Sequence, residues 1–422
     1  MSEKYSKKET VLLRELAKQT MEIAASEENK KKIQLWTDVN DLHPTRPVTL
    51  AYALPWHELN ADGDLTLQCE NTHLREIEQE LRRQLYLHRH MPLDYVIEPC
   101  IRSKIMYKDT GYGIRVDEDT RSSDEDNAIV SHHFNNQISS LEDVDKIKDP
   151  HITYLKEETE DLLAMNHDIF DGIMEVKPYC FLGYMYGPWD ELIRLTGVNE
   201  FMDYLYDDPD LLLALAKRYN DASIARMDQF EELGILTQND DNVLDVAQAG
   251  SGGYRYTKHI PRLAPGETVR RKDMWGNSAA QIFTCISPQM FDLLAVSQEL
   301  KWLDQYALTY YGCCENLSNK MDSLRKIKNL RKISISCWAD PRRAAEEIGR
   351  DYVYSFKPSV IMLAAETLDE EDVLRHLREY VSAARAENCA TEIILKTVST
   401  VRYKPQNLWK FAQLMRQVAE EG

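Results

Sequence analysis

Two thiols and a carboxylate follow one apolar segment of the sequence, in the run Tyr-Tyr-Gly-Cys-Cys-Glu at 310–315. If residues 306–311 form a strand, side chains alternate between its two faces. Continued through the run, this alternation predicts that Cys313 and Glu315 point to the same side and that Cys314 points away. A thiolate and a carboxylate that reach one point are suitable ligands for Zn²⁺. The thiol could equally act as a nucleophile, although a nearby carboxylate disfavours the thiolate form.

The same alternation assigns the residues of the strand to two environments. Leu308 and Tyr310 are expected to pack against helices. Ala307, Thr309 and Tyr311 are expected to face the interior of a closed sheet, which places Tyr311 on the side of the predicted metal ligands.

The segment 332–340 shows a similar pattern. Its packed face consists of Ile333, Ile335 and Cys337, and its other face consists of Ser334, Ser336, Trp338 and Asp340. Trp338 and Asp340 therefore come near the end of the strand, where Asp340 could supply a proton. Alternatively, Asp340 caps a helix that begins at Pro341, because an Asp followed by Pro is a common helix start.

Charged and aromatic residues also follow other apolar segments. The predicted catalytic residues are Asp340, Glu366, Tyr311 and Lys396. The predicted substrate-binding residues are Trp275, Tyr184, Trp189, Trp338 and Gln281. Aromatic side chains can form the wall of a pocket for a small organic ligand, but Tyr and Trp also fill cores, and both interpretations stay open.

These residues need a scaffold that collects the ends of several strands. Short apolar runs are predicted as strands at 48–53, 93–99, 176–184, 244–247, 281–286, 306–311, 332–337, 360–364 and 392–397. Helical patterns separate them at 72–90, 152–172, 198–232, 288–305, 341–349, 369–387 and 405–420. Such alternation predicts an α/β fold with a parallel sheet, and the strand count favours a single (β/α)₈ TIM barrel. Catalytic groups in that fold sit at the C-terminal ends of the strands.

The barrel is predicted to span residues 46–422, after an N-terminal helical extension at 1–45 that includes an amphipathic helix at 9–26. The irregular segment 103–137 is interpreted as a long insertion, with a hairpin as one form. No Gly-rich dinucleotide or P-loop motif is present, which argues against nucleotide binding.

Composition excludes several classes of partner. The net charge of −19 argues against binding to nucleic acid or to anionic membranes, because both need clustered Lys and Arg. No apolar run is long enough for a membrane span, and the N-terminus has no apolar signal region. The eight cysteines are too few for a disulfide framework in 422 residues. We therefore expect a cytoplasmic protein.

Several motifs resemble the uroporphyrinogen-decarboxylase-like superfamily, in particular a branch from anaerobic bacteria that includes corrinoid-dependent methyltransferases. The resemblance covers about residues 30–410. It is carried by residues 36–47 with Asn40-Asp41-Leu42 and Arg46-Pro47, by residues 74–85, by Trp275-Gly276, by Gly312-Cys-Cys-Glu315, by Trp338-Ala-Asp340 and by Ser399-Thr-Val-Arg-Tyr403.

The resemblance implies a (β/α)₈ barrel with its site in the C-terminal mouth. Related methyltransferases hold Zn²⁺ with a His-x-Cys pair and a later Cys. Tyr311 and Cys313 match the pair, so that Tyr311 replaces the His, and no Cys is found near 397–399. Relatives that cleave methyl ethers use more carboxylate and imidazole ligands, and Glu315 would fit as one of the carboxylates.

Three functional hypotheses follow. The first is the methyltransferase of a corrinoid-dependent O-demethylation system, which moves a methyl group from a small donor, such as an aryl methyl ether, to a separate corrinoid protein. Zn²⁺ held by Cys313, by Glu315 or by both would polarise the leaving oxygen. The second is a metal-independent decarboxylase or other lyase of a small aromatic or carboxylated substrate, in which Lys357, Lys396 and Arg402 hold carboxylates. The third is a non-enzymatic binding subunit. A homodimer is one assembly that we consider.

Overall fold

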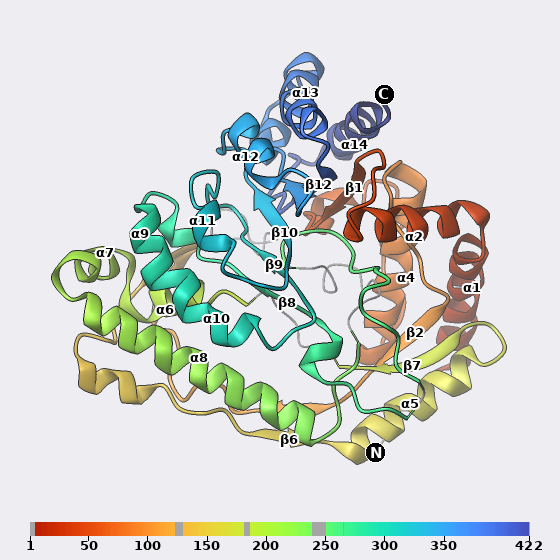
Figure 1. The fold of residues 1–422 in the computed structure, drawn as a ribbon. Helices are drawn as coiled ribbons and strands as arrows, with labels where there is room; N and C mark the ends of the chain where they lie inside the picture. Colours follow the sequence, from red (N-terminus) through yellow and green to blue (C-terminus); the bar gives the residue numbers. More distant parts are fainter. Residues whose placement is uncertain (1–4, 123–129, 181–185, 239–249, 265, 422) are drawn as a thin grey trace.

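The computed structural model describes residues 5–122, 130–180, 186–238, 250–264 and 266–421, and its centre is a curled, six-stranded parallel sheet (Figure 1). The strand order is β1-β12-β11-β10-β9-β8. The strands are β1 (Val48–Tyr52), β8 (Trp275–Ser278), β9 (Leu308–Tyr311), β10 (Leu330–Ile335), β11 (Val353–Phe356) and β12 (Ala390–Lys396). All five neighbouring pairs are parallel. The predicted α/β class with a parallel sheet is thus confirmed.

Two further parallel strands lie outside this sheet. β2 (Cys100–Lys104) pairs only with β7 (Glu175–Tyr179) among the described strands. The first strand of the chain pairs with the last, as it does in a barrel, but the described strands do not form one closed ring of eight. The fold is therefore barrel-like, and full closure is not found in the described part of the chain.

Helices that follow the strands along the chain cover the outer side of the sheet (Figure 1). They include α8 (Pro209–Glu232), α10 (Ser297–Leu303), α12 (Pro341–Ile348), α13 (Glu370–Ala386) and α14 (Pro405–Glu420). In α13 the buried residues Val373, Leu377, Tyr380, Val381 and Ala384 recur with helical period, which gives one apolar stripe toward the sheet. Within the described residues, no helix has both the length and the apolar character needed to cross a bilayer.

The N-terminal segment forms two helices instead of the single one predicted at 9–26. α1 (Lys7–Ala24) begins at a capping box made by Ser6 and Glu9, and α2 (Glu27–Asn40) begins at the cap Ser26. α2 packs against β1 and β12. Its Trp36 is fully buried in the main core, so this helix contributes directly to packing of the sheet.

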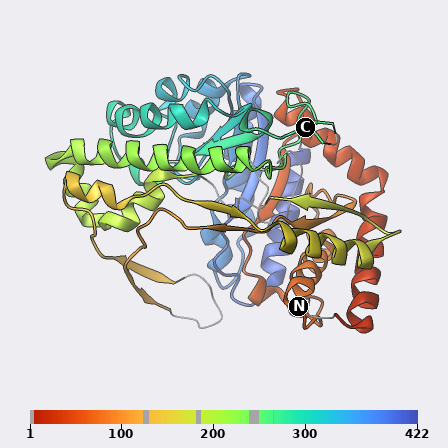
Figure 2. The same ribbon diagram turned by 90° about the horizontal axis from the view of Figure 1, so that it is seen from below.

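The predicted insertion at 103–137 contains the expected hairpin. β4 (Glu118–Arg121) pairs antiparallel with β5 (Ser131–Phe134), and Figure 2 shows this pair projecting from the rest of the molecule. At the start of the insertion, β3 (Tyr107–Asp109) pairs antiparallel with β6 (Ile152–Tyr154).

Three predicted strands were wrong. Residues 93–99 form no strand, and β2 begins directly after them. Residues 281–286 and 360–364 contain the 3₁₀ helices η3 (Gln281–Phe283) and η5 (Val360–Ala364), and the strands of these regions are β8 and β11 upstream. Periodicity alone does not separate a buried loop from a buried strand. The strand predicted at 244–247 lies outside the described residues.

Candidate active site

The thiols and a lysine meet at the C-terminal ends of β9 and β12. Lys396, the last residue of β12, donates a hydrogen bond from Nζ to Sγ of Cys313 at 2.7 Å. Sγ of Cys313 lies 3.6 Å from Sγ of Cys314. Cys313 is buried, Cys314 is exposed and Lys396 is partly buried. Cys314 is exposed, but its sulfur lies beside that of Cys313, so the predicted orientation of Cys314 away from Cys313 is not confirmed.

The pKa values of Cys313, Cys314 and Lys396 depend on one another, because the three side chains interact electrostatically. The hydrogen bond with Cys313 holds the pKa of the Cys314 thiol below its ordinary value. Burial lowers the pKa of Lys396, but the two sulfurs beside it outweigh burial and leave that pKa above its ordinary value. The ammonium of Lys396 therefore stays charged at neutral pH, next to a thiol pair that shares a proton.

A fully buried ion pair lies deeper on the inner face of the sheet. Nζ of Lys332 on β10 lies 2.9 Å from Oε2 of Glu392 on β12, and both side chains have no exposed area. Oγ of Ser355 donates to Oε1 of Glu392 at 2.5 Å. Burial raises the pKa of Glu392, but Lys332 and Lys357 outweigh that effect and keep the carboxyl ionised.

Lys357 connects this ion pair to β9. Its Nζ donates to Oη of Tyr310 at 2.7 Å, to the backbone oxygen of Ser355 at 2.8 Å and to Oγ of Ser355 at 2.5 Å. Burial lowers the pKa of Lys357 to about 7. All three donors of this ammonium are thus used inside the protein, so Lys357 does not offer a free donor for a substrate carboxylate.

A glycine-rich turn at 250–253 packs on the inner network, which we define as Lys332, Glu392, Ser355, Lys357 and Tyr310. The turn was not predicted from the sequence. Oγ of Ser251 lies 2.9 Å from Oη of Tyr310, and the backbone N–H of Gly253 donates to Glu392 at 3.2 Å. A Cβ at Gly252 would approach the Tyr310 ring to 2.6 Å, and one at Gly253 would approach Trp36 to 2.3 Å. Only glycine permits this close approach. The sequence Gly-Ser-Gly-Gly at 250–253 could therefore have predicted a turn packed closely against other side chains.

A second polar cluster lies on the other face of the sheet, toward the helices. Glu299 on α10 is fully buried beside Tyr311 and Ser278, whose hydroxyls approach it. No hydrogen bond of good geometry joins these groups, and both carboxyl oxygens lack a partner among the described residues. Burial raises the pKa of Glu299 to about 8, so it is mainly a neutral acid at pH 7.

Asp190 on α6 (Pro188–Thr196) lies within electrostatic reach of the same cluster. Nε2 of Gln281 donates to Oδ2 of Asp190 at 2.6 Å. Burial raises the pKa of Asp190 to about 7. Gln281, predicted to bind substrate, is therefore engaged by a half-buried acid that sequence reasoning did not identify.

Backbone groups engage the carboxylate of Glu315, which we predicted to share a metal ion with Cys313. Oε1 of Glu315 accepts the backbone N–H of Ala280 at 3.0 Å, and Oε2 accepts that of Cys313 at 2.7 Å. Glu315 thus braces the loop after β9. The strand alternation ends at Gly312, whose φ of 98° turns the chain in a way that side-chain-bearing residues rarely adopt.

The predicted faces of β9 are also reversed. The register places Tyr310 beside Lys332 and Tyr311 beside Ile333. In a parallel sheet, residues in register lie on the same face. Tyr310 therefore belongs to the inner network, whereas Tyr311 packs edge-on against Phe291 in the helical layer, with ring centroids 6.0 Å apart.

The described residues do not suit zinc at Cys313 and Glu315. Both oxygens of Glu315 accept backbone N–H groups, and the sulfur of Cys313 accepts from Lys396. No third ligand accompanies this pair within the described part of the chain. We therefore assign no chemical step to zinc here, and its binding stays a prediction for metal analysis of the purified protein.

The predicted acids Asp340 and Glu366 are both exposed. Asp340 is the N-cap of α12, where its side chain accepts from the backbone N–H groups of Arg342 and Arg343 at 3.0 and 3.1 Å. The capping interpretation of Asp340 is thus confirmed. Catalytic roles for Asp340 and Glu366 stay predictions.

The predicted aromatic residues lie in different environments. Trp338 is 69% exposed at the end of β10. Trp275 is buried, and its Nε1 donates to the backbone oxygen of Arg255 at 3.0 Å. Trp189 is fully buried against Phe283. Tyr184 lies outside the described residues. Trp338 is therefore the one of the three described Trp candidates that is open to a ligand.

Comparison with known proteins gives no family. No family model matches the chain, and no curated protein matches it in sequence. A solved structure of a methyltransferase from Methanosarcina mazei is similar over 92% of this chain and 98% of that chain, with 11% sequence identity and a TM-score of 0.49.

Proposed function

We propose that this chain is a methyltransferase that passes a methyl group from a small donor, such as an aryl methyl ether, to a corrinoid carried by a separate protein. The proposal is supported most directly by Lys396, a cation held by Cys313 and Cys314 at the C-terminal end of the sheet. In barrel-like α/β folds the reacting groups gather at this end. The motifs that resemble corrinoid-dependent methyltransferases include this thiol pair.

Lys396 has the property that ether cleavage needs. When the bond between methyl carbon and oxygen breaks, the oxygen keeps the electron pair and the acceptor supplies the pair for its new bond to the methyl group. The leaving phenolate is then negatively charged. A fixed cation at that oxygen stabilises the transition state, and no proton has to move in the step.

The contacts of Lys396 allow this role. Its ammonium has three N–H donors, and the described residues engage one of them, through Cys313. The sulfurs keep the ammonium charged and hold its position. Cys313 and Cys314 are therefore positioning residues, and Lys396 is the proposed catalytic residue.

Substitution of Lys396 gives the direct test. We expect wild-type protein to methylate a reduced corrinoid with a panel of methoxyarenes, followed by visible absorbance. Lys396→Met should lower the rate about 10²- to 10³-fold, the usual loss for one charge-stabilising donor, and Lys396→Arg should recover part of it. Lys410→Met, which breaks an exposed ion pair with Glu370, is the matched control.

Two results would contradict the proposal. One is full activity of Lys396→Met. The other is no methyl transfer by wild-type protein with any donor in the panel when a reduced corrinoid is present.

A lyase is the second candidate, because the two N–H donors of Lys396 that no described residue engages could bind a substrate carboxylate. The other cations predicted to hold a carboxylate fit less well. Lys357 already donates three hydrogen bonds inside the protein, and Arg402 is exposed. A lyase would release carbon dioxide from small aromatic acids without any corrinoid. Carbon dioxide release measured with the purified protein alone separates the two activities.

A further inference from the structure

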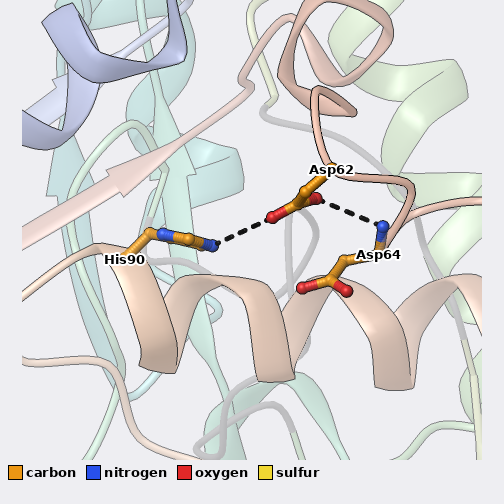
Figure 3. A group of neighbouring side chains, drawn as sticks. All are labelled: Asp62, Asp64 and His90. Atoms are coloured by element: carbon orange, nitrogen blue, oxygen red, sulfur yellow. Dashed lines mark hydrogen bonds and ion pairs between the residues drawn. The ribbon is translucent and has the colours of Figure 1, made fainter.

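The loop after the first strand places two carboxylates next to an imidazole (Figure 3). Asp62 and Asp64 lie between α3 (Trp56–Leu59) and α4 (Thr72–His90), and His90 is the last residue of α4. One ligand atom from each side chain lies within 4.8 Å of the other two. Across the described residues, this is the one group of three His, Cys, Asp or Glu side chains with such spacing.

The imidazole of His90 is held in place with an unused ring nitrogen. The ring stacks on Trp409, with centroids 4.2 Å apart and planes 9° apart, and contacts Tyr86. Nε2 is shielded from solvent and has no hydrogen-bond partner among the described residues. It points toward Oδ2 of Asp62 at 3.8 Å, beyond hydrogen-bond distance (Figure 3). A shielded nitrogen without a partner is costly, and a ligand would satisfy it.

The two carboxylates come from a tight turn. Gly63 has a φ of 86°, and Oδ1 of Asp62 accepts the backbone N–H of Asp64 at 3.2 Å. This bond orients Asp62 so that its other oxygen faces His90 (Figure 3). Asp64 has a competing partner, because the guanidinium of Arg89 contacts its Oδ2.

We propose that Asp62, Asp64 and His90 bind a divalent first-row transition ion such as Co²⁺, Zn²⁺ or Mn²⁺. Imidazole nitrogen together with carboxylate oxygen suits these ions, whereas Ca²⁺ and Mg²⁺ prefer oxygen alone. The ion ties the loop after β1 to the end of α4 and, through the stacked ring, to Trp409 on α14. Its role is structural and separate from the thiol site.

Cobalt is the probe for the test. Titration of metal-free, full-length protein with Co²⁺ should give visible absorption for one ion per chain, without the intense ultraviolet band of a cobalt–thiolate bond. Asp62→Asn and His90→Gln should each weaken binding at least 10-fold. Arg89→Gln should tighten binding several-fold, because it removes the competing cation. Bound Co²⁺ should raise the Tm of wild-type protein but not that of Asp62→Asn.

Two controls keep the test specific. Asp119 and His133 are exposed cross-strand partners on β4 and β5, and Asp119→Asn with His133→Gln should leave Co²⁺ binding unchanged. Cys313→Ser should also bind Co²⁺ normally, which separates this site from any metal at the thiols. The proposal is overturned if Co²⁺ does not bind, or if it binds Asp62→Asn and His90→Gln as tightly as wild type.

Discussion

Adjacent tyrosines on β9 enter two polar clusters with opposite character. Tyr310 faces the inner network, where Glu392 pairs directly with Lys332 and is linked to Lys357 through Ser355. Tyr311 faces Glu299, a buried acid without a hydrogen-bond partner among the described residues. In the cluster at Tyr310, buried charges of opposite sign neutralise each other. In the cluster at Tyr311, Glu299 keeps its proton and is therefore uncharged. The two solutions respond differently to mutation and to pH.

The largest expected change in stability comes from removing the negative charge of Glu392. Glu392→Gln leaves the ammonium of Lys332 buried without a counter-ion, which should lower the free energy of unfolding by about 3–5 kcal/mol. Urea denaturation measures this change. Glu160→Gln, which removes an exposed ion pair with Lys156, is the control and should cost less than about 1 kcal/mol. Equal effects of the two variants would contradict the comparison.

Glu299 should make stability fall as pH rises. Its pKa is raised from 4.5 to about 8 in the folded protein. Between these values the folded state holds a proton that the unfolded state has lost, so stability decreases by on the order of 1 kcal/mol per pH unit and levels off above about pH 8.

Glu299→Gln should remove this contribution, because the amide does not titrate. Unfolding of both proteins between pH 5 and 8 measures the difference in slope. The pKa of Asp190 is also raised, and this carboxyl contributes to the slope with the same sign in both proteins. Parallel slopes would mean that Glu299 is ionised in the folded state.

Replacing each of the two tyrosines by Phe should give the smallest changes in stability, and because both variants lose one hydroxyl, they can be compared directly. Tyr310→Phe removes the hydroxyl that Lys357 and Ser251 contact, and it should cost about 1–3 kcal/mol. Tyr311→Phe removes a hydroxyl without a hydrogen-bond partner among the described residues and should change stability by less than about 0.5 kcal/mol. Thermal unfolding at one pH compares them. A larger loss for Tyr311→Phe would reverse our assignment of the two faces.

The sequence predicted the scaffold better than the boundaries of its strands. Alternating apolar runs and helical patterns identified β1, β9, β10 and β12, because these strands are buried on both faces. β8 has the sequence Trp-Gly-Asn-Ser and carries little apolar signal, so its neighbour 281–286 was chosen instead. The division into an extension at 1–45 and a barrel at 46–422 stays a prediction.

The candidate site was predicted in part. The end of β9 and Lys396 were identified because charged or thiol groups follow strands there. The pairing of Cys313 with Glu315 stays a prediction, but Gly312 breaks the strand alternation from which we derived it. Glu299 and Glu392 were missed because a helix and a distant strand bring them to β9, and sequence spacing contains no signal for such contacts.

Synthesis of the chain proceeds for more than three hundred residues before β1 can meet β12, its one neighbour in the described sheet. Such long-range pairing is slow to form, and an apolar strand left without a neighbour tends to aggregate. α2 leaves the ribosome before β1 and packs on it in the finished fold. We therefore expect this helix to shield the strand in the nascent chain, where its early position in the sequence is an advantage.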